Sequence, residues 1–246
     1  CRGRLDVAQR ALREAIAYTD STGAGDMTRG FAQTWLAAVT GMAGDAAGAR
    51  REFAAIQWWG ADSAACEWDA EKAIAEAWMH AAEGAVPRSI SVLRSAAEQE
   101  RPRGRAAWEV LLLQTATQLG DDTTAPRLAE LADRVQGPRA TVAAAHAAAL
   151  AAGDGDGLLA AARDYEMFGD MRAAADAARQ ARRAGRNTAQ GFTSRQREII
   201  LLVAQGLSNK EIAERLTMSV RSVEGHLFRA SQRVGASSRD ELVARL

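Results

Sequence analysis

The stretch that decides the fold is residues 206–233, GLSNKEIAERLTMSVRSVEGHLFRASQR, which is typical of two helices joined by a tight turn. Gly206 can adopt the left-handed conformation that ends a preceding helix. Ser208 with Glu211 three residues later is the pattern of a capping box, so a short helix is expected to begin there. The apolar side of this short helix consists of Ile212, Ala213 and Leu216.

The second helix of this stretch is expected to have one apolar and one polar side. Thr217-Met218 is the predicted turn, and Ser219 is placed to cap the helix that follows. Apolar residues spaced three and four apart would face the core. This apolar stripe consists of Val220, Val223, Leu227, Ala230 and Val234. The polar side consists of Arg221, Ser222, Glu224, Gly225, Arg229, Gln232 and Arg233.

A short helix, a turn and a longer helix with an arginine-bearing side are the layout of a helix-turn-helix that reads DNA. Gly225 is the informative residue on that side, because glycine inside a helix costs roughly 0.5–1 kcal/mol against alanine. Core packing does not explain a glycine on the polar side. Two interpretations are open: Gly225 leaves room for a close approach to DNA, or it is a tolerated surface glycine.

The composition favours closely packed helices. The chain has 246 residues, enough for one large or two modest domains, and 48% of them are hydrophobic. Alanine is the most frequent of these and favours helices with close contacts. No run of about 20 apolar residues occurs, so no membrane span is expected.

The ends and the cysteines of the chain indicate its setting. No secretory signal is found at the start, so a cytoplasmic protein is expected. Cys1 and Cys66 share no motif, and both are expected to be free thiols in a reducing compartment. The chain begins with Cys inside a predicted helix, so we expect a fragment of a longer protein.

Charge is divided unevenly along the chain, which has 31 Lys/Arg and 31 Asp/Glu in total. Residues 179–246 hold 13 Lys/Arg and 6 Asp/Glu, which leaves 18 and 25 for residues 1–178. A basic excess near the carboxyl end of an otherwise acidic chain indicates a nucleic-acid-binding module.

Residues 1–185 are predicted to form an array of helical hairpins. Apolar residues follow helical spacing throughout, and alternating β-branched runs are absent. Gly44, Gly84, Gly120 and Gly153 are 40, 36 and 33 residues apart, near the length of a two-helix repeat. Stacked pairs would bury a core that no single pair could bury. This region resembles a tetratricopeptide-like array with a degenerate consensus.

Six tryptophans lie in the first half of the chain, and two interpretations are open for them. They pack in the core and between repeats, or they line a concave surface that binds a peptide or another ligand. The six are Trp35, Trp58, Trp59, Trp68, Trp78 and Trp108.

No catalytic or metal-binding pattern is found, so the chain is predicted to be no enzyme and to hold no cofactor or metal. Residues 153–157, GDGDG, resemble a calcium loop, but Tyr165 stands where a bidentate Glu is needed. A helix-ending turn is predicted there instead. His80, His146 and His226 are isolated and lack ligand spacing. No glycine loop that cradles phosphates is present.

Residues 192–246 are predicted to form a separate domain of four helices, joined to residues 1–185 by a linker at residues 186–191. The surrounding stretch is basic and polar with no apolar period, which is typical of a solvated tether. Its arginines would also suit phosphate contacts. Capping boxes, each typically worth about 1 kcal/mol, are predicted at Thr193, Ser208 and Ser238.

Residues 192–246 resemble the LuxR-type helix-turn-helix domain of bacterial transcription regulators. The region before them is similar, more weakly, to the repeat region of the large ATP-dependent LuxR members, in which an ATPase lies upstream. The matching residues are Thr193, Arg195, Arg197, Glu198, Gly206-Leu-Ser-Asn-Lys-Glu-Ile-Ala213, Leu216, Ser219, Val223, His226, Gly235, Ser238-Arg239 and Leu242-Val243.

The resemblance implies that the third helix of the domain enters the major groove. Two departures are that many members have Lys where this chain has Glu224, and a larger residue where it has Gly225. Glutamate can accept from cytosine N4, so the preferred DNA sequence is expected to differ. The residues implied to face bases are Ser222, Glu224, Gly225, Phe228 and Arg229. Lys210, Arg221 and Arg233 are implied to meet phosphates, with Ser219 capping the helix beside them.

The sequence therefore predicts an all-α protein with a helical-hairpin array and a four-helix helix-turn-helix domain. The first hypothesis is a cytoplasmic transcription regulator that binds double-stranded promoter DNA as a homodimer. Its repeats would sense a protein or small-molecule effector, and RNA polymerase would be a further partner. In the family the fourth helix forms the dimer surface, so Leu242, Val243 and Leu246 either serve that role or close the core. The alternative is a helical-repeat interaction scaffold with an accessory DNA-binding module.

Overall fold

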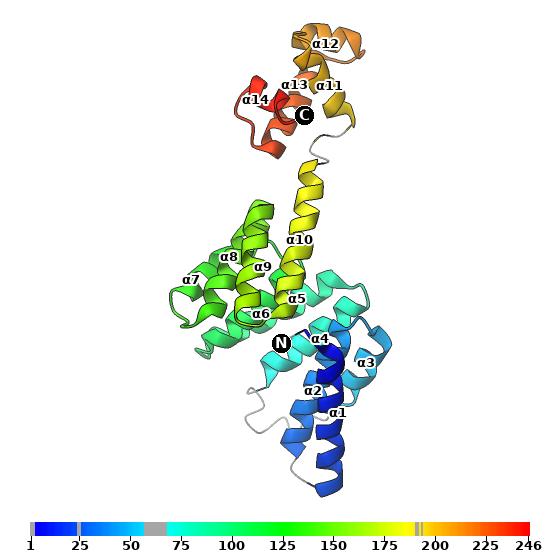
Figure 1. Cartoon of the computed structure of the whole chain (residues 1–246), viewed down its shortest axis with the longest axis vertical. Coiled ribbons are helices and arrows are strands. Elements are labelled where there is room, and N and C mark those ends of the chain that lie inside the picture. The colour runs from blue at the N-terminus through cyan, green and yellow to red at the C-terminus, as the bar shows by residue number, and fades with distance from the viewer. Residues whose placement is uncertain (1–2, 24–25, 57–67, 190–191, 193) are drawn as a thin grey trace. The chain divides into compact units, whose positions relative to one another are not determined.

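The computed structural model describes all residues except 1–2, 24–25, 57–67, 190–191 and 193. The described residues form helices and no strands, which confirms the predicted all-α class. The chain divides into two compact units, Cys1–Ala181 and Arg182–Leu246 (Figure 1). Among the described residues, no helix has the length and apolar character needed to cross a membrane.

The first unit is an array of helical hairpins, as predicted (Figure 1). Successive helices pair as α2 with α3, α4 with α5, α6 with α7 and α8 with α9. The first helices of the pairs also stack, α2 on α4, α4 on α6 and α6 on α8. The helices are α1 (Leu5–Thr22), α2 (Asp26–Met42), α3 (Ala46–Ala54), α4 (Asp69–Ala82), α5 (Val86–Glu100), α6 (Ala106–Gln118), α7 (Ala125–Ala132), α8 (Pro138–Ala152), α9 (Gly155–Met167) and α10 (Met171–Ala189).

The regularly spaced glycines lie at the turns inside these hairpins. Gly44, Gly84, Gly120 and Gly153 have φ angles of 85°, 81°, 103° and 65°, which an L side chain rarely adopts. After Gly153, the carboxylate of Asp154 accepts from the backbone N–H groups of residues 156 and 157 and caps α9. The GDGDG sequence is therefore a helix-ending turn followed by an N-cap, as predicted.

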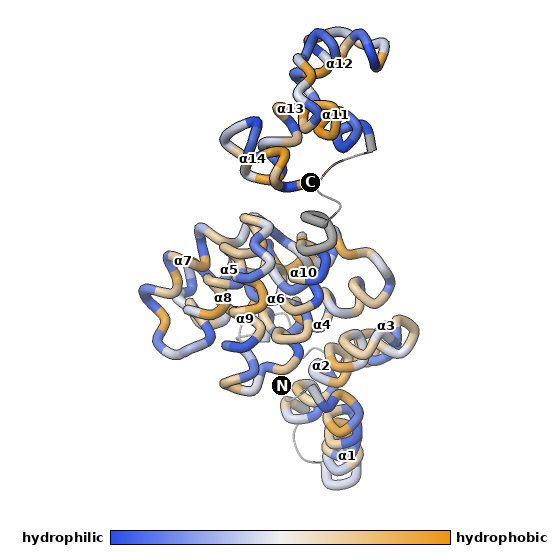
Figure 2. The backbone as a smooth tube through the Cα atoms, turned by 45° about the horizontal axis from the view of Figure 1, so that its top comes forward, coloured by the Kyte–Doolittle hydropathy of each residue, from blue (hydrophilic) through white to orange (hydrophobic). Residues whose placement is uncertain are grey.

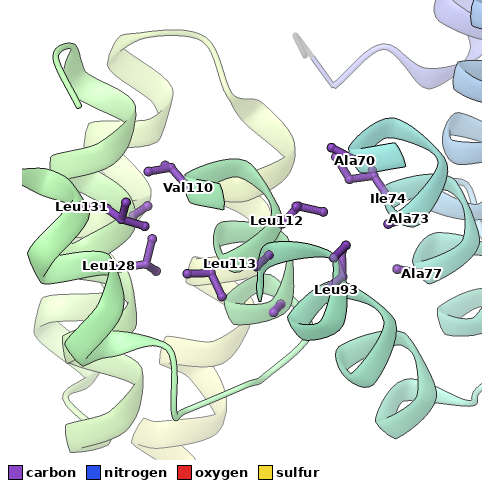
Figure 3. Packing of buried hydrophobic residues seen from close by; sticks show 14 of the residues in the cluster. Ala70, Ala73, Ile74, Ala77, Leu93, Val110, Leu112, Leu113, Leu128 and Leu131 are labelled. Atoms are coloured by element: carbon purple, nitrogen blue, oxygen red, sulfur yellow. The ribbon is translucent and has the colours of Figure 1, made fainter. Parts of the chain in front are cut away.

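Small side chains allow the stacked helices to approach closely. A β-carbon built on Gly41 of α2 would lie 2.6 Å from both the carbonyl carbon and oxygen of Trp78 in α4. The largest cluster of buried apolar residues extends from α4 to α8. Figure 3 shows side chains of α6, such as Leu112 and Leu113, between those of α4 and α5 and those of α7.

Three of the tryptophans follow the core-packing interpretation. Trp78 is buried in the main cluster, and Trp35 and Trp108 are partly buried against it. Trp68 packs edge-on against Phe31, with ring centroids 5.1 Å apart. Trp58, Trp59, Cys1 and Cys66 lie outside the described residues.

Part of the predicted tether is helical. α10 continues to Ala189, so residues 186–189 of the expected linker belong to a helix, and residues 190–191 lie outside the described part. Alanine and arginine favour helices, and no proline interrupts residues 171–189. The exact domain limits remain a prediction.

The second unit has a compact core of its own. After the last part of α10 it contains α11 (Ser194–Ala204), α12 (Asn209–Arg215), α13 (Val220–Val234) and α14 (Arg239–Val243). α13 packs against each of the other three. Figure 2 shows polar and apolar residues alternating along these helices, as expected when one side of each helix faces a core. Ile199 and Ile212 are fully buried there.

Candidate nucleic-acid interface

The start of α12 is fixed by the predicted capping box. Ser208 Oγ accepts from the backbone N–H of Glu211 at 3.3 Å. A carboxylate oxygen of Glu211 accepts from the backbone N–H of Ser208 at 2.7 Å. The hydroxyl and backbone N–H of Ser208 both donate to this carboxylate and lower the pKa of Glu211. Gly206, with a φ of 84°, ends α11 as expected.

The turn between α12 and α13 lies at the predicted residues. Thr217 has a φ of 52°, the left-handed region that a β-branched residue rarely occupies. Ser219 follows and caps α13, because its hydroxyl accepts from the backbone N–H of Ser222 at 3.1 Å. The two serine hydroxyls are also 2.8 Å apart. Local strain and local capping thus set where α13 begins.

Two arginines hold the helix-turn-helix together, and sequence reasoning gave them no structural role. Arg195 Nη2 donates to the carbonyl of Leu216 at 2.9 Å and so ties α11 to the turn. Arg239 donates to Asn209 Oδ1 at 2.8 Å and to the carbonyl of Leu207 at 2.7 Å. Both arginines are among the residues that match the LuxR-type pattern, and this match was the one signal in the sequence that could have indicated their structural role.

The fourth helix starts slightly differently from the prediction. Ser238 Oγ accepts from the backbone N–H of Glu241 at 3.1 Å, so Ser238 is the N-cap of α14 as predicted. The Glu241 carboxylate accepts from the backbone N–H of Ser237 at 2.8 Å instead of closing a box with Ser238. Thr193, the expected cap of α11, lies outside the described residues.

The core side of α13 follows the predicted stripe except at its first residue. Val223 and Ala230 are fully buried, and Leu227 and Val234 pack partly buried against the core clusters. Val220 was expected in the stripe but is 40% exposed. It is the first residue of the helix, directly after the cap, and Val223 one turn later fills the core instead.

The opposite side of α13 brings together the predicted site residues. Arg221, Ser222, Glu224, Arg229 and Arg233 are exposed, Gly225 is half-buried, and Phe228 is 66% exposed. In the described part of the chain, none of these three arginines forms an ion pair. Lys210 is exposed on α12, and Ser219 lies at the start of α13.

Gly225 is open on this exposed side. The nearest atoms to a β-carbon built on Gly225 all belong to the guanidinium of Arg229, beginning with Nη1 at 3.4 Å. A flexible side chain can move by a few tenths of an ångström, so core packing does not require glycine here. The open position lies among side chains that can donate hydrogen bonds and carry positive charge.

The three apolar residues near the carboxyl end have different environments. Leu242 is buried in the core, and Val243 packs partly buried against it. Leu246 is 42% exposed. Leu242 therefore closes the core, and Leu246 remains accessible on this unit.

Residues 190–246 match the family model described as bacterial regulatory proteins, luxR family. The C-terminal unit contains a LuxR-family helix-turn-helix domain. The LuxR-family domain thus extends from the end of the expected linker to the last residue and includes α11–α14. Every predicted site residue lies within it.

Relatives of the LuxR-family domain are regulatory proteins by name. The response regulator Rre1 of Synechocystis is 50% identical over 52 residues, 21% of this chain and 22% of the relative. The tetrathionate response regulatory protein TtrR of Salmonella typhimurium is 43% identical over 56 residues, 23% of this chain and 27% of the relative. The oxygen regulatory protein NreC of Staphylococcus aureus is 44% identical over 52 residues, 21% of this chain and 24% of the relative. The chain thus spans about a quarter of each relative's length, and no solved structure matches it.

Proposed function

We propose that this chain is a DNA-binding transcription regulator whose LuxR-family domain recognises promoter DNA. The observation that carries the proposal is the exposed side of α13, which presents Arg221, Arg229 and Arg233 without acidic partners in the described part of the chain. An α-helix fits the major groove of DNA, and arginine reads guanine or meets phosphates there.

The proposed contacts divide into bases and phosphates. Ser222, Glu224, Gly225, Phe228 and Arg229 are proposed to face base edges. Glu224 would accept from cytosine N4, and Phe228 would meet a thymine methyl. Lys210, Arg221 and Arg233 are proposed to meet phosphates, with Ser219 holding the start of the helix between them.

The distribution of charge along the chain supports the proposal that the LuxR-family domain binds DNA. Residues 179–246 hold 13 Lys/Arg against 6 Asp/Glu, so the basic excess lies in the LuxR-family domain and in the residues directly before it. Positive charge concentrated beside a groove-reading helix raises both the affinity for DNA and the rate of association. The names of the relatives, a response regulator and two regulatory proteins, support a regulatory role.

We further propose the oligomeric state, the location and the additional partners of this regulator. We propose a homodimer on DNA that uses the surface around the exposed Leu246, and a cytoplasmic location where promoter DNA and RNA polymerase are present. The helical hairpins are proposed to sense an effector. That the chain belongs with the large ATP-dependent members also stays a proposal.

Selection from a random duplex library tests the proposal directly. The full chain should enrich a short motif, and a symmetric motif is expected if a dimer binds. The rival is an interaction scaffold in which the hairpin array binds a protein partner, and the array itself is the observation in its favour. If no motif is enriched and all duplexes are retained equally, the result would favour the interaction scaffold.

A further inference from the structure

Helix α10 carries a row of arginines that the proposed DNA contacts of α13 leave unused. Residues 179–246 hold 13 Lys/Arg and 6 Asp/Glu, an excess of seven positive charges. Residues 190–246, which match the family model, hold 9 Lys/Arg and 6 Asp/Glu, an excess of three. The other four positive charges all lie in α10, at Arg179, Arg182, Arg183 and Arg186. More than half of the basic excess therefore comes from this one helix.

Two of these arginines lie on the side of α10 opposite its buried side. Ala173, Ala177 and Ala181 recur every four residues along the helix and are buried. In a helix with 3.6 residues per turn, Arg182 and Arg183 project away from this alanine stripe. Both arginines are exposed. The side of α10 that does not pack is thus positively charged.

The rotation of α10 is fixed by polar contacts just before these arginines. Gln180 Nε2 donates to the carbonyl of Thr117 in α6 at 2.8 Å. Gln180 Oε1 lies 2.7 Å from Nε2 of His146 in α8. A helix held on its buried side keeps the opposite side in solvent. The arginine pair is therefore presented in advance, which lowers the cost of binding a partner.

Arg182 and Arg183 have no acidic partner in the part of the chain that the structure describes. The carboxylate of Asp176, the last acidic residue before them, already pairs with two other arginines of α10, at 3.0 Å and 2.6 Å. Residues 177–197 contain no Asp or Glu. Two uncompensated guanidinium groups on a fixed helix attract an anionic surface.

The composition of α10 favours nucleic acid over a lipid membrane as that anionic surface. Helices that bind membranes place Trp, Phe or Leu beside their basic residues. Between residues 172 and 189 the apolar side chains are all alanine, and the alanine stripe is buried. The guanidinium group of arginine matches the oxygens of a phosphate with paired hydrogen bonds.

We propose that Arg182 and Arg183 bind backbone phosphates of the DNA that flanks the site read by α13. The inference rests on the proposed function and extends it to the flanking duplex. α10 ends at Ala189 and α11 begins at Ser194, so the chain between them spans at most about 18 Å. Arg182 lies about 10 Å further back along α10. At 3.4 Å per base pair, the contacted phosphates lie within roughly ten base pairs of the LuxR-family domain.

Salt titrations on two duplexes test the flanking contact. One duplex ends at the motif selected from the random library, and the other extends it by about 12 base pairs of random sequence on each side, just beyond the estimated reach. Binding of the full chain is measured by fluorescence anisotropy. On the long duplex, Arg182→Gln/Arg183→Gln should lower the slope of log affinity against log salt by about two per bound chain. A fourfold decrease in salt should then widen the difference in affinity about tenfold. On the short duplex the two proteins should have the same slope.

Two further variants separate charge from structure. Arg182→Lys/Arg183→Lys keeps both charges and should keep most of the slope. Arg10→Gln/Arg13→Gln removes two exposed arginines of α1 and should leave the slope unchanged. A lysine variant that loses as much slope as the glutamine variant would show that charge is not the cause, and would overturn the inference.

The outcomes distinguish this inference from the proposed function. If wild type and the Arg182→Gln/Arg183→Gln variant bind the short duplex and have equal slopes on the long one, the flanking contact is refuted and the proposed function stands. If that variant equals wild type on DNA but loses binding to phosphatidylglycerol vesicles, the arginines serve a membrane and the inference is wrong. Absence of wild-type binding to both duplexes would overturn the proposed function and the flanking contact together.

Discussion

The guanidinium of Arg229 lies over Gly225 on the exposed side of α13, so close that a β-carbon on Gly225 would come 3.4 Å from Arg229 Nη1. The three nearest atoms to such a β-carbon all belong to this guanidinium. Glycine is therefore not required by packing, although it weakens the helix. The explanation we favour is that the bare backbone and the adjacent guanidinium together meet the edge of a base pair.

Gly225→Ala should separate helix stability from DNA recognition. The substitution should raise the free energy of unfolding by about 0.5–1 kcal/mol, because alanine is the better helix former. Binding to the selected operator should weaken, since the new methyl group occupies the open position that a base edge would approach. Urea unfolding and mobility-shift titration measure the two effects. Unchanged operator affinity would show that Gly225 is only a tolerated surface glycine.

Gly41→Ala should have the opposite effect on stability. The added methyl group would lie 2.6 Å from backbone atoms of Trp78, and backbone cannot move aside as a side chain can. We expect α2 and α4 to separate and the first unit to lose about 1–3 kcal/mol of stability. Gly225→Ala serves as the matched control in the same unfolding assay. A Gly41→Ala chain as stable as the wild type would show that the close contact is absent.

Stability of the first unit should fall at mildly acidic pH because of His146. This ring is fully buried, with Nε2 2.7 Å from Gln180 Oε1 and Nδ1 3.4 Å from the hydroxyl of Tyr165. Burial is the main cause that lowers the pKa of His146 below its ordinary value of 6.5. The unfolded chain then binds the proton more tightly, so the free energy of unfolding falls as pH drops below about 6.5.

Urea unfolding between pH 5 and pH 8 measures this effect. The slope should approach at most about 1.4 kcal/mol per pH unit for one proton. His146→Gln keeps a polar side chain and cannot titrate, so its profile should be flatter over the same range. Identical profiles for the two proteins would contradict the assignment to His146.

Phe228 should contribute to sequence preference through an apolar contact. It is 66% exposed on a helix whose core side is filled by Val223 and Ala230, so burial does not explain an aromatic residue there. Replacing thymine by uracil in the selected operator removes only a methyl group and should reduce affinity by about 0.8 kcal/mol at the contacted position. The Phe228→Ala protein should not distinguish the two bases. If wild type and variant respond equally at every thymine, Phe228 does not read the methyl.

The features that the sequence predicted correctly depend on residues close together in the chain. Gly206, the Ser208–Glu211 box and the Ser219 cap act within four residues, so their spacing alone specifies helix ends. The regularly spaced glycines of the first unit were also predictable, because each hairpin turn needs only one residue in the left-handed conformation.

The features that it missed depend on contacts between distant segments. Arg195 and Arg239 reach carbonyls 21 and 32 residues away, which no local pattern reveals. A cavity next to Trp35 and Gln118 exists only because several helices meet around it. Helix α10 extends into the expected linker, because residues 171–189 contain many alanines and arginines and no proline.

The salt dependence of operator binding tests the central claim most directly. The logarithm of the association constant of the full chain should fall linearly with the logarithm of salt concentration, as counterions leave the DNA. Arg233→Gln should weaken binding to all sequences and reduce the slope by about one. Arg88→Gln, which alters an exposed arginine of the first unit, should leave the slope unchanged. An affinity that is indifferent to salt, or a slope that Arg233→Gln leaves unaltered, would contradict the account.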